Sequence, residues 1–266
     1  MANREILVVS FGTTVKTARE KALDSILVSM RDAFPDVTVE RCFTSKMVRD
    51  KIAREEGITM AGPQEALQQA VDNGIDELIV IPTHLMEGID LRDFKSVLAE
   101  YKDRFKICKC AGPLAETMED RQLCVKAISE RLSEAMDLKA SDESTAVVLI
   151  GHGTKDKANS LYENLQTEMN EWGYERFVIG TIEATPSYDD VVEGLKKLEV
   201  SNVILVPFLV VAGDHAVNDI AGDQEDSWKN RLSQEGFSVK VLKEGLGEMR
   251  GIHSLLISHA ERLVNA

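Results

Sequence analysis

Short apolar runs alternate with amphipathic segments along the whole chain. Eight runs are predicted to be β-strands: Ile6–Ser10, Val37–Phe43, Leu78–Pro82, Lys106–Cys108, Ala146–Ile150, Phe177–Ile182, Val203–Pro207 and Ser238–Leu242. Several of them are apolar throughout, which is typical of parallel strands covered on both faces. Between the runs, apolar residues recur at helical spacing, as at Ala18, Ala22, Ile26 and Met30. The alternation predicts the α/β class, with doubly wound parallel sheets.

The two halves of the chain resemble each other. Three pairs of segments match in the same order: residues 6–14 with 147–155, 76–88 with 201–213, and 106–116 with 239–249. We therefore predict a duplication, with two similar doubly wound domains and a cleft between them. The N-terminal α/β domain is expected over residues 1–138 and the C-terminal α/β domain, which carries the metal site argued below, over residues 139–266.

Composition and charge narrow the class of partner. The chain is 44% hydrophobic and 29% charged, with a net charge of −14. Nucleic acids and anionic membrane surfaces bind basic patches on proteins. This excess of acidic residues therefore disfavours either of them as the main partner. Val203–Val211, the longest apolar stretch, is too short to span a bilayer. No targeting segment is recognised, so we expect a cytoplasmic protein. The sequence does not decide whether the protein forms a homo-oligomer.

The cysteines are not arranged as a metal or disulfide framework. Cys42, Cys108, Cys110 and Cys124 do not form paired C-x-x-C motifs. In a reducing compartment, free thiols are the expected state.

Three residues with metal-binding side chains follow three strands of the second half. His152 comes shortly after Ala146–Ile150 and lies between two glycines, Glu183 directly follows Ile182, and His215 lies in the loop after Val203–Pro207. Ligands bind beyond the carboxyl ends of strands in open α/β sheets. Two imidazoles and a carboxylate suit cobalt, iron, nickel or zinc, and three ligands leave positions open for a substrate. We predict a catalytic metal site of His152, Glu183 and His215.

A structural role is the alternative for each of these residues. A histidine after a strand often packs or caps, and Glu183 also suits the start of a loop. Asp214 is a favoured helix cap, which would place His215 in the first turn of a helix.

The first half carries different side chains at the matching positions. Aligning the repeats places Phe11 opposite His152, Phe43 approximately opposite Glu183, and Asp90 opposite His215. Aromatic residues at two of these positions suggest the hypothesis that a flat macrocycle packs on the first half while the second half holds a metal.

Further residues of the first half are candidates for binding the substrate. His84 follows the strand Leu78–Pro82 near Glu87 and Asp90, and either contacts substrate, relays protons or simply packs. The turn at Thr13 precedes a helix whose backbone N–H groups suit an anion. The predicted substrate-binding residues are Phe11, Thr13, His84, Glu87 and Asp90.

Four segments carry a resemblance to a known family. VVSFGTT, IGHGT, GTIEATPSY and, above all, AGDHAVNDIAGDQEDSWK resemble the anaerobic cobalt chelatases of the CbiK type, which are class II chelatases. The resemblance implies a lyase of two domains that inserts Co²⁺ into sirohydrochlorin, or into factor II, in anaerobic cobalamin biosynthesis. It implies a tetrapyrrole as partner, Co²⁺ as the substrate metal and no organic cofactor. It also assigns the metal to His152, Glu183 and His215.

Other functions stay open from the sequence. Fe²⁺, Ni²⁺ or Zn²⁺ could replace Co²⁺, and a siroheme-forming ferrochelatase differs from a cobaltochelatase chiefly in the metal supplied. A non-catalytic haem- or metal-binding protein is a second alternative. A phosphotransfer enzyme with a phosphohistidine at His152 is a third, although such sites usually place arginines beside the histidine.

Overall fold

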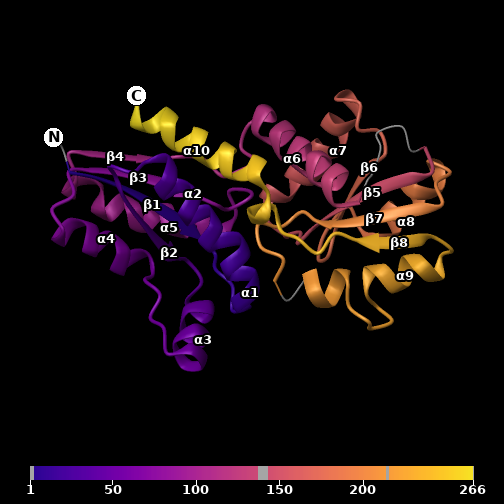
Figure 1. The fold of residues 1–266 in the computed structure, drawn as a ribbon, viewed down its shortest axis with the longest axis horizontal. Helices are drawn as coiled ribbons and strands as arrows, with labels where there is room; N and C mark the ends of the chain where they lie inside the picture. The colour runs from indigo at the N-terminus through magenta and orange to yellow at the C-terminus, as the bar shows by residue number, and fades with distance from the viewer. Residues whose placement is uncertain (1–2, 137–142, 214–215, 266) are drawn as a thin grey trace. The chain divides into compact units, whose positions relative to one another are not determined.

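Eight parallel strands form two sheets in the computed structural model, which describes residues 3–136, 143–213 and 216–265 (Figure 1). The first sheet has the order β2-β1-β3-β4 and consists of β1 (Arg4–Ser10), β2 (Thr38–Phe43), β3 (Glu77–Pro82) and β4 (Ile107–Cys110). The second has the order β6-β5-β7-β8 and consists of β5 (Thr145–Gly151), β6 (Phe177–Thr181), β7 (Asn202–Pro207) and β8 (Ser238–Val241). The predicted α/β class with two similar parallel sheets is confirmed.

Helices connect the strands and lie on both sides of each sheet (Figure 1). The α-helices are α1 (Lys16–Ala18), α2 (Ser25–Ala33), α3 (Lys46–Glu56), α4 (Pro63–Asp72), α5 (Ile89–Tyr101), α6 (Met118–Met136), α7 (Ser160–Glu171), α8 (Tyr188–Lys197), α9 (Trp228–Gln234) and α10 (Arg250–Val264). Short 3₁₀ or π-helical segments are η1 (Arg19–Asp24), η2 (Lys102–Arg104), η3 (Lys157–Asn159), η4 (Ala216–Ile220) and η5 (Leu246–Glu248). The predicted apolar stripe of the first helical segment is buried at all four positions.

The hydrogen-bond register shows that the two sheets are built in the same way. Ser10 pairs with Phe43 in the first sheet, and Gly151 pairs with Thr181 in the second. Phe43 therefore corresponds to Thr181, so its predicted alignment with Glu183 is wrong by two residues. Phe43 is also fully buried, because it lies at the end of a covered strand and cannot present its ring to a ligand.

The chain forms two compact units, and the last helix belongs to the first of them. One unit consists of Met1–Glu116 and Arg250–Ala266, and the other of Thr117–Met249. Helix α10 packs on β3 and α2, and Ser29 Oγ lies 2.8 Å from His253 Nδ1. The division differs from the predicted domains 1–138 and 139–266 in two ways: α6 packs on α7 and belongs to the second unit, and α10 returns to the first sheet.

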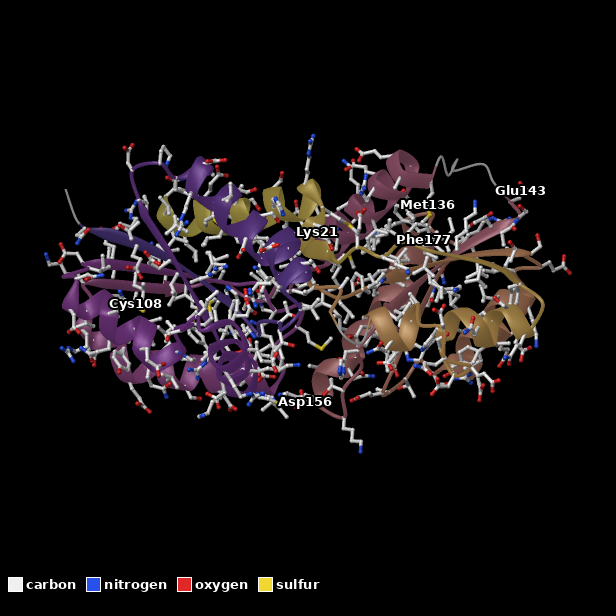
Figure 2. The ribbon with its side chains drawn as sticks, turned by 60° about the horizontal axis from the view of Figure 1, so that its bottom comes forward. Lys21, Cys108, Met136, Glu143, Asp156 and Phe177 are labelled. Carbon is white, nitrogen blue, oxygen red and sulfur yellow. The ribbon has the colours of Figure 1, made fainter. Side chains whose placement is uncertain are left out.

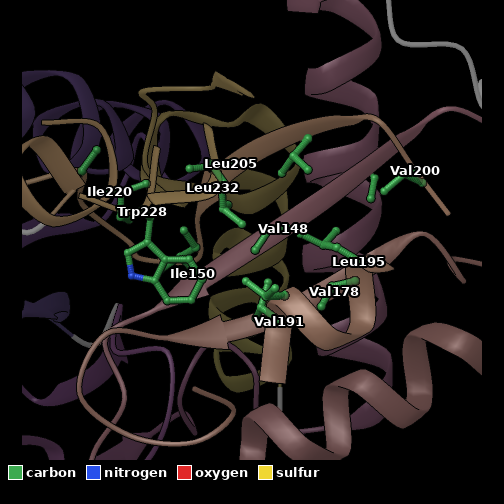
Figure 3. Close-up of a cluster of buried hydrophobic side chains, with 14 residues drawn as sticks. Val148, Ile150, Val178, Val191, Leu195, Val200, Leu205, Ile220, Trp228 and Leu232 are labelled. Atoms are coloured by element: carbon green, nitrogen blue, oxygen red, sulfur yellow. The ribbon is translucent and has the colours of Figure 1, made fainter. Parts of the chain in front are cut away.

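The interior of the second unit fixes the strands that end at the predicted metal site. Branched side chains of β5, β6 and β7 pack against α8 and α9, with the indole of Trp228 at one end of the cluster (Figure 3). Gly180 of β6 leaves room for that indole, since a Cβ there would lie 2.7 Å from it. The corresponding core of the first unit gathers Leu7, Val9, Leu78 and other side chains of β1 and β3 with those of α4 and α5.

All four cysteines are free thiols, as predicted. Cys42 and Cys124 are buried, while Cys108 and Cys110 of β4 are half-buried. Figure 2 labels Cys108 in the first unit. Burial raises the pKa of Cys124 to about 12, so this thiol stays protonated. Within the described parts of the chain, no helix has both the length and the apolar character needed to cross a bilayer.

Candidate metal site

His152 projects from a tight loop that only small neighbours allow. The loop begins at Gly151, the last residue of β5, where a Cβ would lie 2.3 Å from the ring of Tyr162. It continues at Gly153, whose φ of +82° lies in the left-handed region that glycine tolerates. A Cβ at Gly153 would approach the backbone nitrogen of Ala184 to 2.8 Å. The flanking glycines therefore bring His152 close to the loop that follows β6.

Glu183 lies beside His152. Its backbone N–H donates a hydrogen bond of 2.9 Å to the carbonyl oxygen of His152. Its Oε2 lies 3.7 Å from Nδ1 of His152, and the side chains are 58% and 40% exposed, respectively. An imidazole and a carboxylate thus meet at the surface of the unit, beyond the carboxyl ends of two neighbouring strands.

A backbone carbonyl also lies beside the ring of His152. Nδ1 lies 3.1 Å from the carbonyl oxygen of Gly153, which can only accept a hydrogen bond. Contacts of this kind between a ring nitrogen and a carbonyl commonly orient metal-binding histidines.

A half-buried amide links the two loops, and a buried hydroxyl supports one of them. The amide of Asn159 accepts from the N–H of Thr154 at 3.0 Å and donates to the carbonyl of Thr185 at 2.7 Å. The hydroxyl of Tyr162 lies beneath the loop and accepts from the N–H of Gly153 at 3.5 Å. Burial raises the pKa of Tyr162 to about 12, so it is a neutral support.

The sequence did not single out these supporting residues. The helical spacing of Tyr162 predicts only a core position. Asn159, however, precedes a helix at a position where a capping residue is expected, and this was an available signal.

The third predicted ligand, His215, lies outside the described residues. The strand that leads to it, β7, ends at Pro207. Beyond it, Val210 accepts a 2.8 Å hydrogen bond from the N–H of Gly247. Among residues 3–136, 143–213 and 216–265, no group of three His, Cys, Asp or Glu side chains could hold a metal ion. The set of three ligands thus stays a prediction, of which His152 and Glu183 are adjacent.

Phe11 and Thr13 follow β1 at the edge that corresponds to the His152 loop. The ring of Phe11 is 44% exposed and suits a contact with a ligand. Thr13 is buried, and its hydroxyl accepts from the N–H of Val15 at 3.2 Å. Its carbonyl accepts from Arg19 at 3.3 Å. Thr13 therefore shapes the turn, and a ligand would meet the backbone there rather than the hydroxyl.

His84, Glu87 and Asp90 lie between β3 and the first turn of α5. The carboxylate of Glu87 pairs with Lys95 and is partly exposed. Asp90 is exposed, and partial burial of its carboxyl with repulsion from Asp93 raises its pKa. Both ring nitrogens of His84 are shielded from solvent, and burial lowers the pKa of His84 to about 4.

Known proteins resemble this chain over nearly its whole length. The model of the cobalt chelatase (CbiK) family matches residues 4–265. The sirohydrochlorin cobaltochelatase of Salmonella typhimurium is 28% identical over 264 residues, which cover 98% of this chain and 97% of that protein. The sirohydrochlorin cobaltochelatase CbiKC of Nitratidesulfovibrio vulgaris is 28% identical over 268 residues, which cover 100% of this chain and 92% of that protein.

Solved structures agree on the fold. SirB from Bacillus subtilis with Fe³⁺ superposes with a TM-score of 0.67 at 17% identity, over 99% of this chain and 96% of that chain. The sirohydrochlorin chelatase SirB from Bacillus subtilis subspecies spizizenii, in complex with cobalt, gives 0.65 at 14% identity, over 100% and 96%. These likenesses show a chelatase-like fold, and the family match over residues 4–265 shows that the chain belongs to the cobalt chelatase (CbiK) family.

Proposed function

We propose that this cobalt chelatase inserts Co²⁺ into sirohydrochlorin, or its oxidised relative factor II, in anaerobic cobalamin biosynthesis. His152, Glu183 and His215 are the proposed ligands of the incoming ion. The observation that carries the proposal is the 3.7 Å approach of His152 Nδ1 to the Glu183 carboxylate beyond β5 and β6. The names of the Salmonella and Nitratidesulfovibrio relatives support the choice of tetrapyrrole.

The reaction requires exchange of ligands on the ion and loss of two protons from the ring. The imidazole of His152 binds Co²⁺ in its neutral form, so protons compete with the ion and binding weakens in acid. The carboxylate of Glu183 offsets part of the charge of Co²⁺. Two of the four ring nitrogens carry an N–H; as these two bond to the ion, their N–H bonds break and two protons leave, which balances the 2+ charge of Co²⁺, while the other two nitrogens bind through their lone pairs.

Holding both reactants in one geometry supplies much of the rate advantage of such a site. The hydrogen bonds of Asn159 serve this purpose, because they join the loop of His152 to the loop of Glu183, and Tyr162 supports the loop of His152. In the first unit, the exposed ring of Phe11, the backbone turn at Thr13, and Glu87 and Asp90 are the proposed contacts of the tetrapyrrole.

Anaerobic insertion assays test the proposal. Absorbance of sirohydrochlorin is followed after Co²⁺ is added to the wild type and to His152→Ala, Glu183→Ala and His215→Ala. We expect each variant to lose most of its initial rate, at least about tenfold, as for lost metal-site partners. Glu193→Gln changes an exposed carboxylate on α8 and should keep the wild-type rate.

Two results would reject the proposal. Wild-type rates in all three variants would show that His152, Glu183 and His215 do not bind the incoming ion. A wild type that binds sirohydrochlorin but inserts no metal would refute the reaction, and parallel assays with Fe²⁺, Ni²⁺ and Zn²⁺ would show whether another ion is the substrate.

A further inference from the structure

His84 occupies a position that the second unit fills with leucine. Pro82 pairs with Val9 and Pro207 pairs with Ile150 at the same step of the two sheets. Two residues later, the carbonyl of His84 accepts the N–H of Leu114 at 2.8 Å, and the carbonyl of Leu209 accepts the N–H of Leu246 at 2.8 Å. The same backbone bonds hold both positions, so this fold does not require an imidazole there.

The imidazole of His84 has unsatisfied hydrogen-bonding groups. Within the described part of the chain, neither Nδ1 nor Nε2 has a hydrogen-bond partner, and both atoms are shielded from solvent. Such shielding costs free energy that a leucine side chain would not cost. Buried polar groups without partners are rare enough in folded proteins to call for an explanation.

The protonation state of His84 limits what it can do. Burial lowers its pKa to about 4, so the ring is neutral near pH 7. A neutral imidazole presents one N–H donor and one lone pair. The segment His84–Met86 is half-buried, so a ligand would meet His84 at the surface of the unit rather than in its core.

The same edge of the first sheet exposes large apolar side chains. Phe11, Met47 and Ile89 follow β1, β2 and β3, respectively, and are 44%, 74% and 60% exposed. Carboxyl ends of parallel strands share one edge of a sheet, which is where ligands bind in such folds. Exposed apolar side chains that follow neighbouring strands at such an edge favour a ligand with a broad apolar face.

We propose that His84 contacts the tetrapyrrole, with its imidazole accepting a hydrogen bond from a pyrrole N–H while Phe11, Met47 and Ile89 cover the face of the ring. This inference rests on the proposed function, because it takes the substrate of that reaction as the ligand. A tetrapyrrole has a flat apolar surface, which suits the exposed apolar side chains, and central N–H donors, which suit the imidazole of His84. Binding supplies a donor to the unpaired ring nitrogen.

Two variants separate this role from a structural one. His84→Leu copies the residue of the second unit, and His84→Asn keeps hydrogen-bonding capacity in a smaller side chain. We measure the Kd for metal-free sirohydrochlorin by fluorescence titration, the KM for Co²⁺ in the insertion assay, and the melting temperature. We expect His84→Leu to keep or raise the melting temperature, to raise the Kd about tenfold or more, and to leave the KM for Co²⁺ unchanged. His84→Asn should recover part of the affinity.

Several outcomes would overturn the inference. An unchanged Kd in His84→Leu would show that the imidazole does not contact the ring. A higher KM for Co²⁺ with an unchanged Kd would assign His84 to the metal instead. Loss of the fold in both variants would show that the position needs a histidine for packing. Because the titration contains no metal, it decides the role of His84 even if the wild type binds sirohydrochlorin without inserting Co²⁺.

Discussion

The backbone N–H of Glu183 donates to the carbonyl oxygen of His152, and the N–H of Ser45 makes the equivalent bond to Phe11 at 3.2 Å in the first unit. The two sheets therefore place the same pair of loop positions side by side. In the second unit these positions carry an imidazole and a carboxylate, and in the first an aromatic ring and a hydroxyl. The scaffold is duplicated, while the side chains suited to metal occur in one copy.

Replacement of Glu183 should weaken metal binding before any tetrapyrrole is present. Glu183→Gln keeps the size of the side chain but removes its charge beside His152. We expect the Kd for Co²⁺ to rise at least about tenfold, because even outer partners of metal ligands contribute that much. Isothermal titration with Co²⁺ measures the effect. Glu193→Gln on α8 serves as the control, and an equal loss in both variants would point to general electrostatics instead.

Glycine at position 153 should be required for the approach of the two loops. In Gly153→Ala, the φ of +82° is unfavourable, and the new Cβ would meet Ala184 and Thr181 at 2.8–2.9 Å. Gly173→Ala has nearly the same φ, +83°, but meets nothing within 4 Å.

We expect Gly173→Ala to lose about 1–2 kcal/mol of unfolding free energy from backbone strain alone. Gly153→Ala should lose more, and should also bind Co²⁺ more weakly. Chemical denaturation and Co²⁺ titration of both variants test this. Equal destabilisation with unchanged Co²⁺ affinity would show that the close contact is unimportant.

The ion pair between Arg121 and Glu168 should contribute strongly to the second unit. Arg121 donates to both carboxylate oxygens of Glu168, with Nε 2.6 Å from Oε2, and both side chains are largely buried. Arg121→Met leaves a buried carboxylate without this partner and should cost about 3–5 kcal/mol. In contrast, Lys197→Met breaks an exposed pair with Glu193 and should cost less than about 1 kcal/mol. Urea denaturation compares the two, and similar losses would contradict the assignment.

Glu5 should make the stability of the protein fall as pH rises through the weakly acidic range. Burial, with repulsion from Glu40, raises the pKa of Glu5 from 4.5 to about 7. The unfolded chain then loses this proton at a lower pH than the folded protein does. The contribution of Glu5 to stability is present below pH 4.5 and is lost as the pH rises to about 7.

Comparison with Glu5→Gln isolates this effect. The glutamine mimics the neutral carboxyl, so the difference in melting temperature should be small near pH 4.5 and should favour the variant increasingly towards pH 7. A constant difference across this range would show that Glu5 titrates alike in both states.

Most of the fold, and the adjacency of two proposed ligands, followed from local sequence patterns. Short β-rich runs marked the eight described strands, and β1, β3, β5 and β7 are the most apolar because a covered parallel strand needs apolar residues on both faces. The rule that ligands gather beyond strand ends then brought together His152 and Glu183 from positions far apart in the chain.

Features that depend on tertiary contacts were less predictable. Phe43 was misaligned because the repeats share little identity around β2, and only the strand register places Ser45 opposite Glu183. The missing hydrogen-bond partners of His84 are also invisible in the sequence, since they depend on which groups the fold brings near. The contact between the Tyr162 hydroxyl and the backbone of Gly153 is invisible in the sequence for the same reason.

The packing of α10 on β3 and α2 has a consequence for synthesis on the ribosome. The first sheet emerges early, yet the helix that completes its unit is translated only after all of Thr117–Met249. The first unit therefore keeps an apolar surface exposed until α10 has been translated. The second unit is continuous in sequence and can fold as it emerges. A premature stop codon before α10 would therefore destabilise the first unit more than the second.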